Sequence, residues 1–384
     1  MKPLTYVAVD KLALGHNLRQ VRGLLDPGTA LLAVVKANGY GHGLELAGAA
    51  FAEAGADWLG VSTLEEGRAV RRAGLTLPAL VFLPCPEAQF PELIAADLTA
   101  TVTGEAALVA LARAAEAAGR PARFQFFLDG GLGRPGVGRA LPRLLELATG
   151  FAGLELTGIY LHMDNGADFS FSELEALRPG GDFRLLAAAV RDLSGRLLGE
   201  PTPLSVAASG LTLLQPAARL DLVRVGTLLY GQYPGYIPSA QRTLELRSAL
   251  ELRSTIVAVE TLTAGATVGY GAEYTCRRET RVGLLPVGLA SGLGVVPASL
   301  AARRYGGVRA WLRRRVRGAE GHAAWVAGQP TRLLGRIAMD WCCVDLTDLP
   351  ETGPGDEVVL ECRRTLLSPA LPRLEVDLGA AGSA

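Results

Sequence analysis

One stretch indicates both the fold and the chemistry of this chain: Leu31-Leu32-Ala33-Val34-Val35-Lys36-Ala37-Asn38-Gly39-Tyr40-Gly41-His42-Gly43. It joins an apolar run, typical of a buried parallel strand, to a lysine and a glycine-rich continuation. Lys36 is one of only three lysines in 384 residues. An ammonium group placed at the end of a buried strand loses hydration. Its burial costs free energy unless the group is paired with an anion, has its pKa shifted so that it is neutral, or is used in a covalent bond.

A neutral lysine amine forms Schiff bases with carbonyl compounds, and pyridoxal phosphate is the commonest biological carbonyl that needs such a lysine. The placement of Lys36 therefore predicts a reactive amine and a pyridoxal 5'-phosphate cofactor. The alternative is a structural lysine that extends its ammonium into water from the end of a strand. The glycine-rich continuation favours the reactive amine.

From residue 31 to about 230 the chain alternates between short apolar runs and amphipathic stretches. This pattern is typical of an α/β fold with a parallel sheet. We expect strands near 31–36, 58–62, 79–83, 98–102, 123–128, 155–161, 203–207 and 221–225. Helices are expected at 45–54, 64–73, 105–118 and 172–198. Eight strands with intervening helices indicate a closed (β/α)8 barrel, in which the eighth helix has the least distinct pattern.

A chain of this length favours two domains. After residues 234–238 the pattern changes to alternating strands and turns, at 254–259, 281–285 and 356–360. We therefore expect the barrel over residues 1–240 and a mostly β domain over residues 241–384. The first apolar strand could belong to the β domain instead of the barrel.

Charge and composition argue for a small-molecule ligand. Basic and acidic residues number 38 each, and no lysine-rich arm is present, which disfavours nucleic acid or an anionic membrane as partner. The chain has neither a signal-peptide pattern at its start nor an apolar run of membrane-spanning length, so a cytoplasmic location is expected. The arginine-rich stretch 303–317 is interpreted as a solvated surface rather than as an entrance for anions.

The five cysteines form an odd set without CxxC spacing, and the four histidines are scattered. We therefore expect no disulfide framework and no metal site. Barrel enzymes build their sites at the carboxyl ends of the strands. The polar residues at those positions are Lys36, Asp129, Arg134, His162, Ser209 and Arg224.

Phosphate in such barrels is held by loops after the seventh and eighth strands, where Ala208-Ser209-Gly210 and Gly226-Thr227 lie in this sequence. Small polar residues are also ordinary in loops. Because these residues and Lys36 all lie at or directly after the ends of predicted strands, a phosphate site is the better interpretation.

The segment from Ala33 to Gly43 resembles the cofactor-lysine motif of bacterial alanine racemases. Further matching segments follow in order: 128–134, 158–168, 208–231, 268–274 and 335–340. The resemblance implies a (β/α)8 barrel with pyridoxal phosphate on Lys36, a C-terminal β domain, and a head-to-tail homodimer whose active sites are shared. It also implies racemisation of L- and D-amino acids, most simply alanine.

The resemblance also implies the role of each site residue. Tyr40, Ser209, Gly226 and Thr227 would bind the phosphate, and Arg224 would hydrogen-bond the pyridine nitrogen. Arg134 would approach the cofactor's phenolic oxygen and the substrate carboxylate. Tyr270 would be the second catalytic base, and Met339 and Asp340 would line the pocket from the partner chain.

Two bases are what racemisation needs, because one proton leaves one face of the α-carbon and another arrives on the opposite face. Lys36 would serve one face and Tyr270 the other. A free tyrosine titrates near pH 10, so a cation must favour its phenolate, and His162 next to Arg224 would relay that field.

Three positions depart from the family pattern. Phe127 replaces a carbamylated lysine that accompanies the arginine loop in many members, and Leu289 and Glu375 stand where pocket tyrosines are usual. These changes leave open a racemase for larger amino acids such as serine, lysine or arginine. Phe127 and Leu289 also leave open a non-catalytic cofactor-binding homologue. Another reaction of the same fold, such as decarboxylation, is a further alternative, but the Gly269-Tyr270-Gly271 segment favours proton transfer to both faces.

Overall fold

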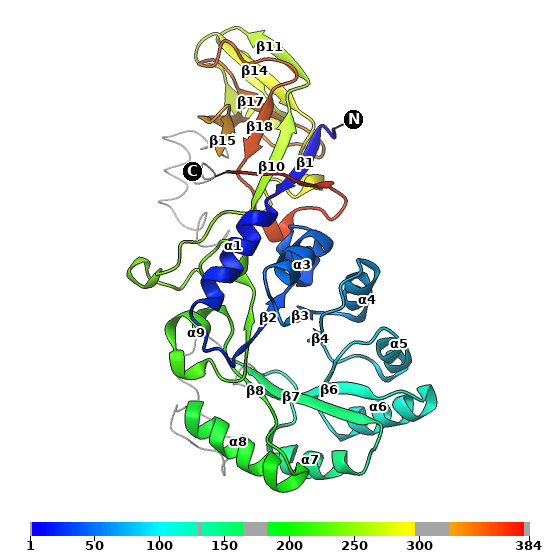
Figure 1. The fold of residues 1–384 in the computed structure, drawn as a ribbon. Coiled ribbons are helices and arrows are strands. Elements are labelled where there is room, and N and C mark those ends of the chain that lie inside the picture. Colours follow the sequence, from blue (N-terminus) through cyan, green and yellow to red (C-terminus); the bar gives the residue numbers. More distant parts are fainter. Residues whose placement is uncertain (1, 130–132, 164–182, 296–322, 380–384) are drawn as a thin grey trace. The chain divides into compact units, whose positions relative to one another are not determined.

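The computed structural model describes residues 2–129, 133–163, 183–295 and 323–379, and the chain divides into two compact units (Figure 1). The barrel unit comprises residues 11–40, 44–249 and 379–384. The β unit comprises residues 1–10, 41–43 and 250–378. The fold class predicted from the sequence, an α/β barrel followed by a mostly β domain, is confirmed.

The strands of the barrel unit are parallel and match the eight that the sequence predicts. They are β2 (Ala30–Val34), β3 (Trp58–Val61), β4 (Ala79–Val81), β5 (Ala100–Val102), β6 (Ala122–Asp129), β7 (Leu154–His162), β8 (Leu204–Ser205) and β9 (Leu222–Val225). They pair in the orders β4-β3-β2-β9 and β5-β6-β7-β8. Single bridges from Leu80 to Thr99 and from Ala208 to Arg224 join the two runs, so the barrel is closed.

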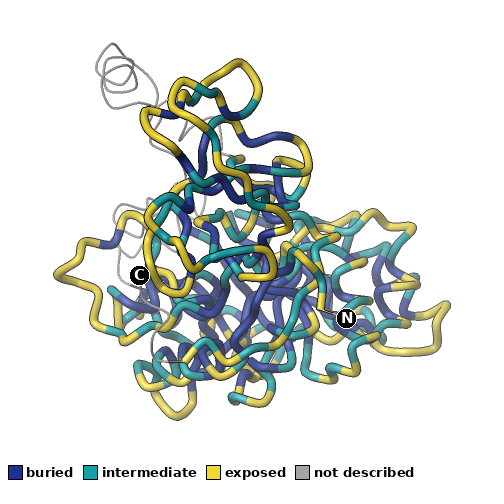
Figure 2. Tube along the Cα trace, turned by 90° about the horizontal axis from the view of Figure 1, so that it is seen from above, coloured by how far each residue is buried: buried dark blue, intermediate teal, exposed yellow. Residues whose placement is uncertain are grey.

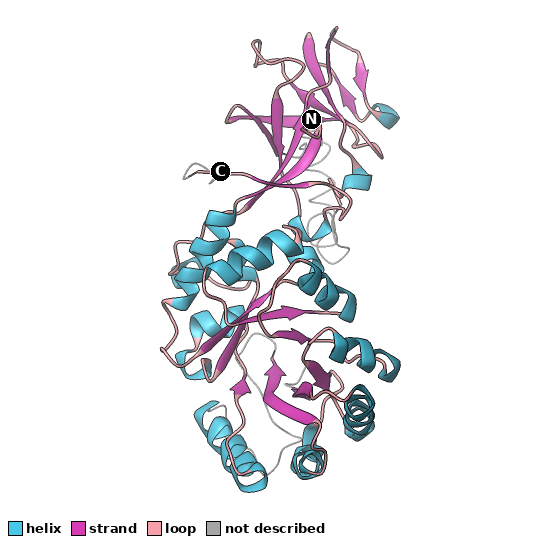
Figure 3. Ribbon diagram, turned by 45° about the vertical axis from the view of Figure 1, so that its right-hand side comes forward, coloured by secondary structure: helices cyan, strands magenta, loops and turns pink. Residues whose placement is uncertain are grey.

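Helices surround these strands (Figure 3). They are α3 (Leu44–Glu53), α4 (Leu64–Arg72), α5 (Phe90–Ala95), α6 (Glu105–Ala118), α7 (Leu141–Thr149), α8 (Phe183–Leu198) and α9 (Ser209–Leu214). The predicted helix at 172–198 corresponds to α8, and its part before residue 183 lies outside the described residues. Short 3-10 turns connect some of the elements of this unit: η1 (Glu87–Gln89), η2 (Gly138–Ala140), η4 (Pro216–Ala218), η5 (Thr227–Tyr230) and η6 (Ser239–Gln241).

The eighth helical position is filled from the start of the chain. After β9 the chain makes only the 3-10 turn η5, and α1 (Lys11–Arg22) packs against η5 and α3. The Asn17 side chain fixes this packing by donating to the backbone oxygens of Leu229, at 3.2 Å, and Arg247, at 2.9 Å. An amphipathic helix that precedes β2, the first strand of the barrel, therefore completes the ring.

The barrel interior is mostly apolar, and buried segments are surrounded by more exposed ones (Figure 2). The buried cluster at its centre consists of Leu32, Val34, Leu80, Phe127, Tyr160 and Leu222. Tyr160 places a hydroxyl within this cluster, where it lies 2.8 Å from the Thr101 hydroxyl. The interior is thus packed with side chains, and buried polar residues such as Thr101 and Arg224 lie among the apolar ones.

The β unit is built on one mixed sheet. Its strands, in spatial order, are β11 (Ala258–Leu262), β14 (Thr280–Leu285), β17 (Cys342–Asp345), β16 (Gln329–Leu334), β15 (Ala323–Val326), β18 (Glu357–Leu360), β10 (Leu250–Thr255), β1 (Thr5–Val9) and β19 (Arg373–Glu375). A separate hairpin pairs β12 (Thr267–Val268) with β13 (Tyr274–Thr275). The 3-10 turns of this unit are η7 (Tyr270–Ala272), η8 (Leu289–Ser291) and η9 (Arg364–Leu366).

The chain changes neighbours within 254–259, so this stretch holds the end of one strand and the start of the next. Strand β10 pairs with β1 and β18, whereas β11 pairs with β14. Between them, the Ile256 N–H donates to the Asp356 oxygen and the Val257 N–H donates to the Leu284 oxygen. Continuous β-branched sequence does not reveal such a switch of partner, since both strands have the same local preference.

Candidate active site

The candidate reactive amine follows directly on β2 and opens an unusual turn. Ala37, Asn38, Gly39 and Tyr40 all have φ between 52° and 60°, so the chain makes a left-handed turn immediately after Lys36. This conformation costs about 1–2 kcal/mol for each residue other than glycine. Strain of this kind persists only where surrounding contacts hold it, and such contacts are present.

Two side chains hold the left-handed turn. The Asn38 Oδ1 accepts from the Leu44 N–H at 3.0 Å, where α3 begins. The Glu66 carboxylate accepts from the Ala37 N–H at 2.7 Å and from the Ser62 N–H at 2.6 Å. The turn is therefore tied both to the helix that follows it and to the neighbouring β3–α4 connection.

The environment of Lys36 favours its neutral form. Burial lowers the pKa of the Lys36 amine, the charge of Arg134 lowers it further, and the Glu66 carboxylate acts in the opposite direction. The Lys36 Nζ lies 5.8 Å from the centre of the Phe82 ring. A larger fraction of this amine is therefore unprotonated and nucleophilic near neutral pH than for a solvated lysine.

Predicted phosphate-binding residues meet at the ends of β8 and β9. The Ser209 Oγ accepts from the Gly226 N–H at 3.1 Å, and Thr227 follows directly as the start of η5. A Cβ built on Gly226 would lie 2.5 Å from the Tyr40 hydroxyl, so that hydroxyl rests against the glycine. The Tyr40 ring stacks on Tyr230 at 4.7 Å. We call Tyr40, Ser209, Gly226 and Thr227 the hydroxyl cluster.

Arg224 is a buried cation on β9, held by three acceptors of the barrel wall. It donates to the Ser205 hydroxyl, to the Leu161 oxygen at 2.6 Å and to the Val206 oxygen at 3.4 Å. Its guanidinium lies 5.1 Å from the centre of the Tyr160 ring. Burial lowers its pKa to about 10, so it remains a cation at neutral pH. Because a guanidinium has five N–H donors, two remain beyond these three bonds.

His162 and Arg134 belong to the same charged neighbourhood. Burial lowers the pKa of His162 to about 4, and the cations Arg224, Arg134 and Lys36 lower it in the same direction. The imidazole is therefore neutral at physiological pH. Arg134 is exposed and lies in the loop after β6, where the Gly133 N–H donates to the Asp129 carboxylate at 3.1 Å.

The remaining predicted residues lie on the β unit. Tyr270, in η7, is 62% exposed, and Met339 is 63% exposed. The Tyr270 ring lies 6.1 Å from that of Trp341, and Asp340 is also exposed. The fold of this unit therefore brings Tyr270 close to Trp341, which directly follows Met339 and Asp340 in the chain.

The departures from the family pattern have definite surroundings. Phe127 is buried, with its ring 5.1 Å from that of Tyr160, so an apolar ring stands at this position in place of a charged group. Leu289 is 42% exposed, and its N–H donates to the Ala338 oxygen at 3.0 Å. Glu375 lies on β19 and is exposed. The stretch 303–317 lies outside the described residues.

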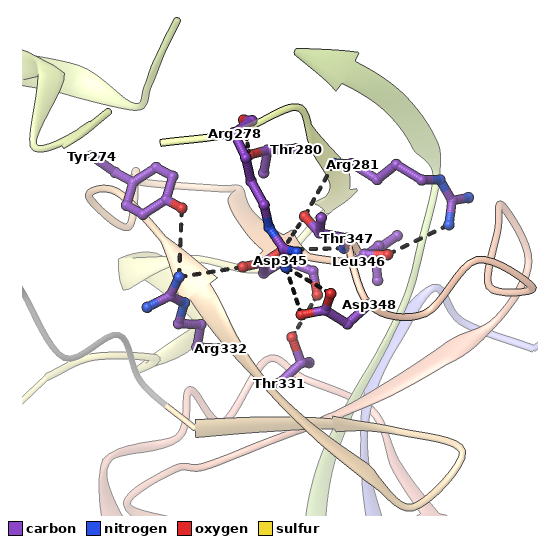
Figure 4. Close-up of polar contacts among 10 residues, drawn as sticks. All are labelled: Tyr274, Arg278, Thr280, Arg281, Thr331, Arg332, Asp345, Leu346, Thr347 and Asp348. Carbon is purple, nitrogen blue, oxygen red and sulfur yellow. Dashed lines mark hydrogen bonds and ion pairs between the residues drawn. The ribbon is translucent and has the colours of Figure 1, made fainter. Parts of the chain in front are cut away.

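The β unit also contains an open hollow with a volume of about 720 Å³ (Figure 4). Its charged groups largely neutralise one another: Arg278 bonds both carboxylate oxygens of Asp348, and Arg332 lies 3.5 Å from Asp345. The Arg332 side chain also reaches the Tyr274 hydroxyl at 3.5 Å. The hollow includes none of the predicted site residues, so the chemistry is sought at the ends of the barrel strands.

Sequence reasoning missed the residues that hold the site together. Glu66, Ser205 and Tyr160 have no distinctive motif of their own, and their partners Ala37 and Arg224 are far away in sequence. One signal was available: Thr63 and Glu66 have the spacing of a helix capping box, which marks the start of α4. It does not reveal the second partner of the carboxylate.

No helix among the described residues combines the length and apolarity needed to cross a bilayer. In the same part of the chain, no group of three or more His, Cys, Asp or Glu residues is arranged to hold a metal ion.

Comparison with known proteins agrees with this geometry. Residues 9–234 match the family model described as alanine racemase, N-terminal domain, and residues 249–368 match the C-terminal domain. An alanine racemase of Desulfovibrio desulfuricans is 31% identical over 92% of this chain and 88% of its own length. One from Frankia casuarinae is 34% identical over 86% and 80% of the two chains.

Solved structures give the same result. The alanine racemase from D-cycloserine-producing Streptomyces lavendulae is 31% identical, with a TM-score of 0.76 over 98% of both chains. The alanine racemase of Clostridium difficile has a TM-score of 0.80 over 97% of this chain and 95% of its own, and at 22% identity it supports the fold alone. The chain therefore belongs to the alanine racemase family of isomerases.

Proposed function

We propose that this chain interconverts L- and D-alanine with pyridoxal 5'-phosphate bound covalently to Lys36. The observation that carries the proposal is the position of Lys36: a half-buried amine with a lowered pKa, two residues beyond the end of a barrel strand. The hydroxyl cluster lies on the neighbouring strand ends of the same unit. Homologues named alanine racemase support the substrate assignment.

The residues present fit pyridoxal phosphate. Gly226 lacks the Cβ that would exclude the Tyr40 hydroxyl, so the hydroxyls of Tyr40 and Ser209 both lie against Gly226, with Thr227 next in the chain. Arg224 retains two unused donors after its three bonds to the barrel wall. In this proposal Tyr40, Ser209, Gly226 and Thr227 hold the phosphate, and Arg224 donates to the pyridine nitrogen.

When bound, pyridoxal phosphate delocalises the electrons left on the substrate α-carbon after its proton is removed. The Lys36 Nζ would take or give that proton on one face. The Tyr270 hydroxyl of a partner subunit does the same on the opposite face. The exposed Arg134 binds the substrate carboxylate.

Arg224 limits side reactions in this scheme. A guanidinium does not give up its proton at neutral pH, so Arg224 would leave a pyridine nitrogen beside it unprotonated, and the bound ring would withdraw electrons less strongly. Arg224 would thereby favour rapid return of the proton, and hence racemisation, over decarboxylation or transamination.

A homodimer with shared active sites is part of the proposal. Tyr270 and Met339 are large side chains that stay more than half exposed in the single chain, and Leu289 is 42% exposed beside the backbone of Ala338. An exposed group of apolar side chains on one unit is typical of a surface covered by a partner. Met339 and Asp340 would then line the substrate pocket of the neighbouring subunit.

A substrate larger than alanine is the second candidate. Leu289 and Glu375 stand where the family places pocket tyrosines, and Phe127 replaces a charged group with a ring. These changes alter both the size and the charge of the pocket. Comparison of kcat/KM for alanine, serine, lysine and arginine decides between the candidates, because a strict preference for alanine excludes the larger substrates.

The proposal is tested by α-proton exchange in heavy water with L-alanine and D-alanine as separate substrates. The wild-type chain should exchange and invert both enantiomers. Lys36→Ala should abolish both reactions, whereas Tyr270→Phe should leave exchange from one enantiomer while inversion is lost. Wild-type protein that binds the cofactor but exchanges neither enantiomer would contradict the proposal.

A further inference from the structure

Glu66 has an unusual position for a helix-capping residue. It is the third residue of α4, and its N–H donates to the hydroxyl of the N-cap residue Thr63 at 3.3 Å. In an ordinary capping box the glutamate side chain returns to the N–H of the N-cap residue. Here the Oε2 instead accepts from the Ser62 N–H at 2.6 Å.

The second carboxylate oxygen of Glu66 bonds to a residue far from α4 in the sequence. It accepts from the Ala37 N–H at 2.7 Å, across the gap between the β3–α4 connection and the turn after β2. Ala37 is the residue next to Lys36 and the first of the left-handed turn. Hydrogen bonds to an ionised carboxylate are about twice as strong as those between neutral groups. One carboxylate therefore ties two strand ends together at the reactive amine.

The left-handed turn depends on such a tether. Ala37, Asn38 and Tyr40 adopt positive φ values that residues with a Cβ rarely adopt, so the turn relaxes unless contacts hold it. Asn38 fixes the distal side of the turn through the Leu44 N–H. On the proximal side, next to Lys36, the side chain that bonds the backbone is that of Glu66.

We propose that Glu66 is a positioning residue for the Lys36 amine, acting through its carboxylate bond to the Ala37 N–H. This inference rests on the proposed function of Lys36 and goes beyond it by naming the group that sets where the amine lies. Glu66 touches neither substrate nor cofactor in this account. Its effect is to keep the amine at a fixed place above the barrel before the cofactor arrives.

The test uses Glu66→Gln in the full-length chain. A glutamine amide keeps one acceptor oxygen but presents an NH2 group at the other position, so one of the two N–H bonds must be lost. The matched control is Glu65→Gln, because Glu65 is an exposed glutamate in the same turn of α4. A second control, Thr63→Ala, weakens the helix cap and leaves the carboxylate in place.

Three quantities are measured for each variant. They are the rate at which supplied pyridoxal phosphate becomes fixed to Lys36 by borohydride reduction, the amide exchange rate at Ala37, and the Tm of cofactor-free protein. We expect Glu66→Gln to slow fixation about tenfold or more, the equivalent of losing one charge-assisted bond, even though removal of the Glu66 charge lowers the pKa of Lys36 and by itself would speed fixation. Exchange at Ala37 should rise in the same variant, while Glu65→Gln behaves as wild type.

The outcomes separate this inference from the proposed function. If the wild-type chain fixes no pyridoxal phosphate, the proposed function fails and takes the role of Glu66 with it. If the wild-type chain fixes it and Glu66→Gln does so at the wild-type rate, only the inference is overturned. It is also overturned if Thr63→Ala slows fixation as much as Glu66→Gln at an equal loss of Tm, since Glu66 would then act only through helix stability.

Discussion

Replacing Gly226 by alanine tests the hydroxyl cluster directly. The new Cβ would lie 2.5 Å from the Tyr40 hydroxyl oxygen and 2.9 Å from the ring carbon that carries it. The Tyr40 ring cannot simply swing away, because it stacks on the buried ring of Tyr230 and its backbone is held in the left-handed turn. The hydroxyl must therefore retreat within a packed environment.

The size of the effect follows from that displacement. An ordinary van der Waals contact begins at 3.4 Å, so the Tyr40 oxygen must move by about 0.9 Å from its position at 2.5 Å. A hydrogen bond from Tyr40 to the phosphate, with its normal range of about 2.7–3.2 Å, does not survive such a shift. Loss of one bond to a charged group costs about 1.5–3 kcal/mol. The Kd for pyridoxal phosphate should then rise about 10- to 150-fold.

The assay is a titration of cofactor-free protein with pyridoxal phosphate, followed by its absorbance, together with urea unfolding of the cofactor-free variant. Overpacking should also lower the free energy of unfolding by about 1–3 kcal/mol. The control is Gly235→Ala, because a Cβ on Gly235 meets no heavy atom within 4 Å. Wild-type affinity in Gly226→Ala would refute the reasoning that places the phosphate against Tyr40.

Three further predictions follow from the charges and the backbone of the barrel unit. Arg134→Gln removes a cation that lowers the pKa of Lys36, so the pH at which cofactor capture is half-maximal should move upward, and an unchanged or lower midpoint would contradict this. The pKa of His162 is about 4 when folded and 6.5 when unfolded, so the unfolded state takes up the proton first and stability falls as pH drops through this window. Between pH 7 and pH 5 the loss should be up to about 2 kcal/mol in urea unfolding, and His162→Gln should remove that part of the slope. Ala37→Gly should leave stability equal or raise it by up to about 1.5 kcal/mol, because relief of the left-handed strain outweighs the added chain entropy; a clear loss in urea unfolding would show that the turn is unstrained.

Local pattern was enough to predict the barrel strands and the position of Lys36. An apolar run followed by a lone lysine predicts a strand end, and parallel strands place their carboxyl ends at one mouth of a barrel. The eighth helical position was not predictable in this way. This position is occupied by α1, which precedes β2, the first strand of the barrel. Asn17 of α1 bonds to residues more than 200 positions away in the sequence.

The contacts that organise the site could not be predicted either, because they depend on tertiary structure. Glu66 reads as a capping residue, and its bond to the Ala37 N–H exists only once β2 and β3 are paired. From the sequence, Ser205 is predicted only as a strand residue, and its hydrogen bond from Arg224 appears only in the folded structure. The left-handed turn is likewise invisible in Ala37 and Tyr40, since neither residue favours positive φ.

The central claim, that Lys36 is the attachment point of a carbonyl cofactor, is tested most directly by incubating the chain with pyridoxal phosphate, reducing with borohydride and mapping the labelled peptide by mass spectrometry. The chain has only three lysines, at positions 2, 11 and 36, so the map is unambiguous. The account predicts a label on Lys36, with Lys2 and Lys11 unmodified. Protein that takes up no cofactor, or carries the label on Lys2 or Lys11 instead, would contradict it.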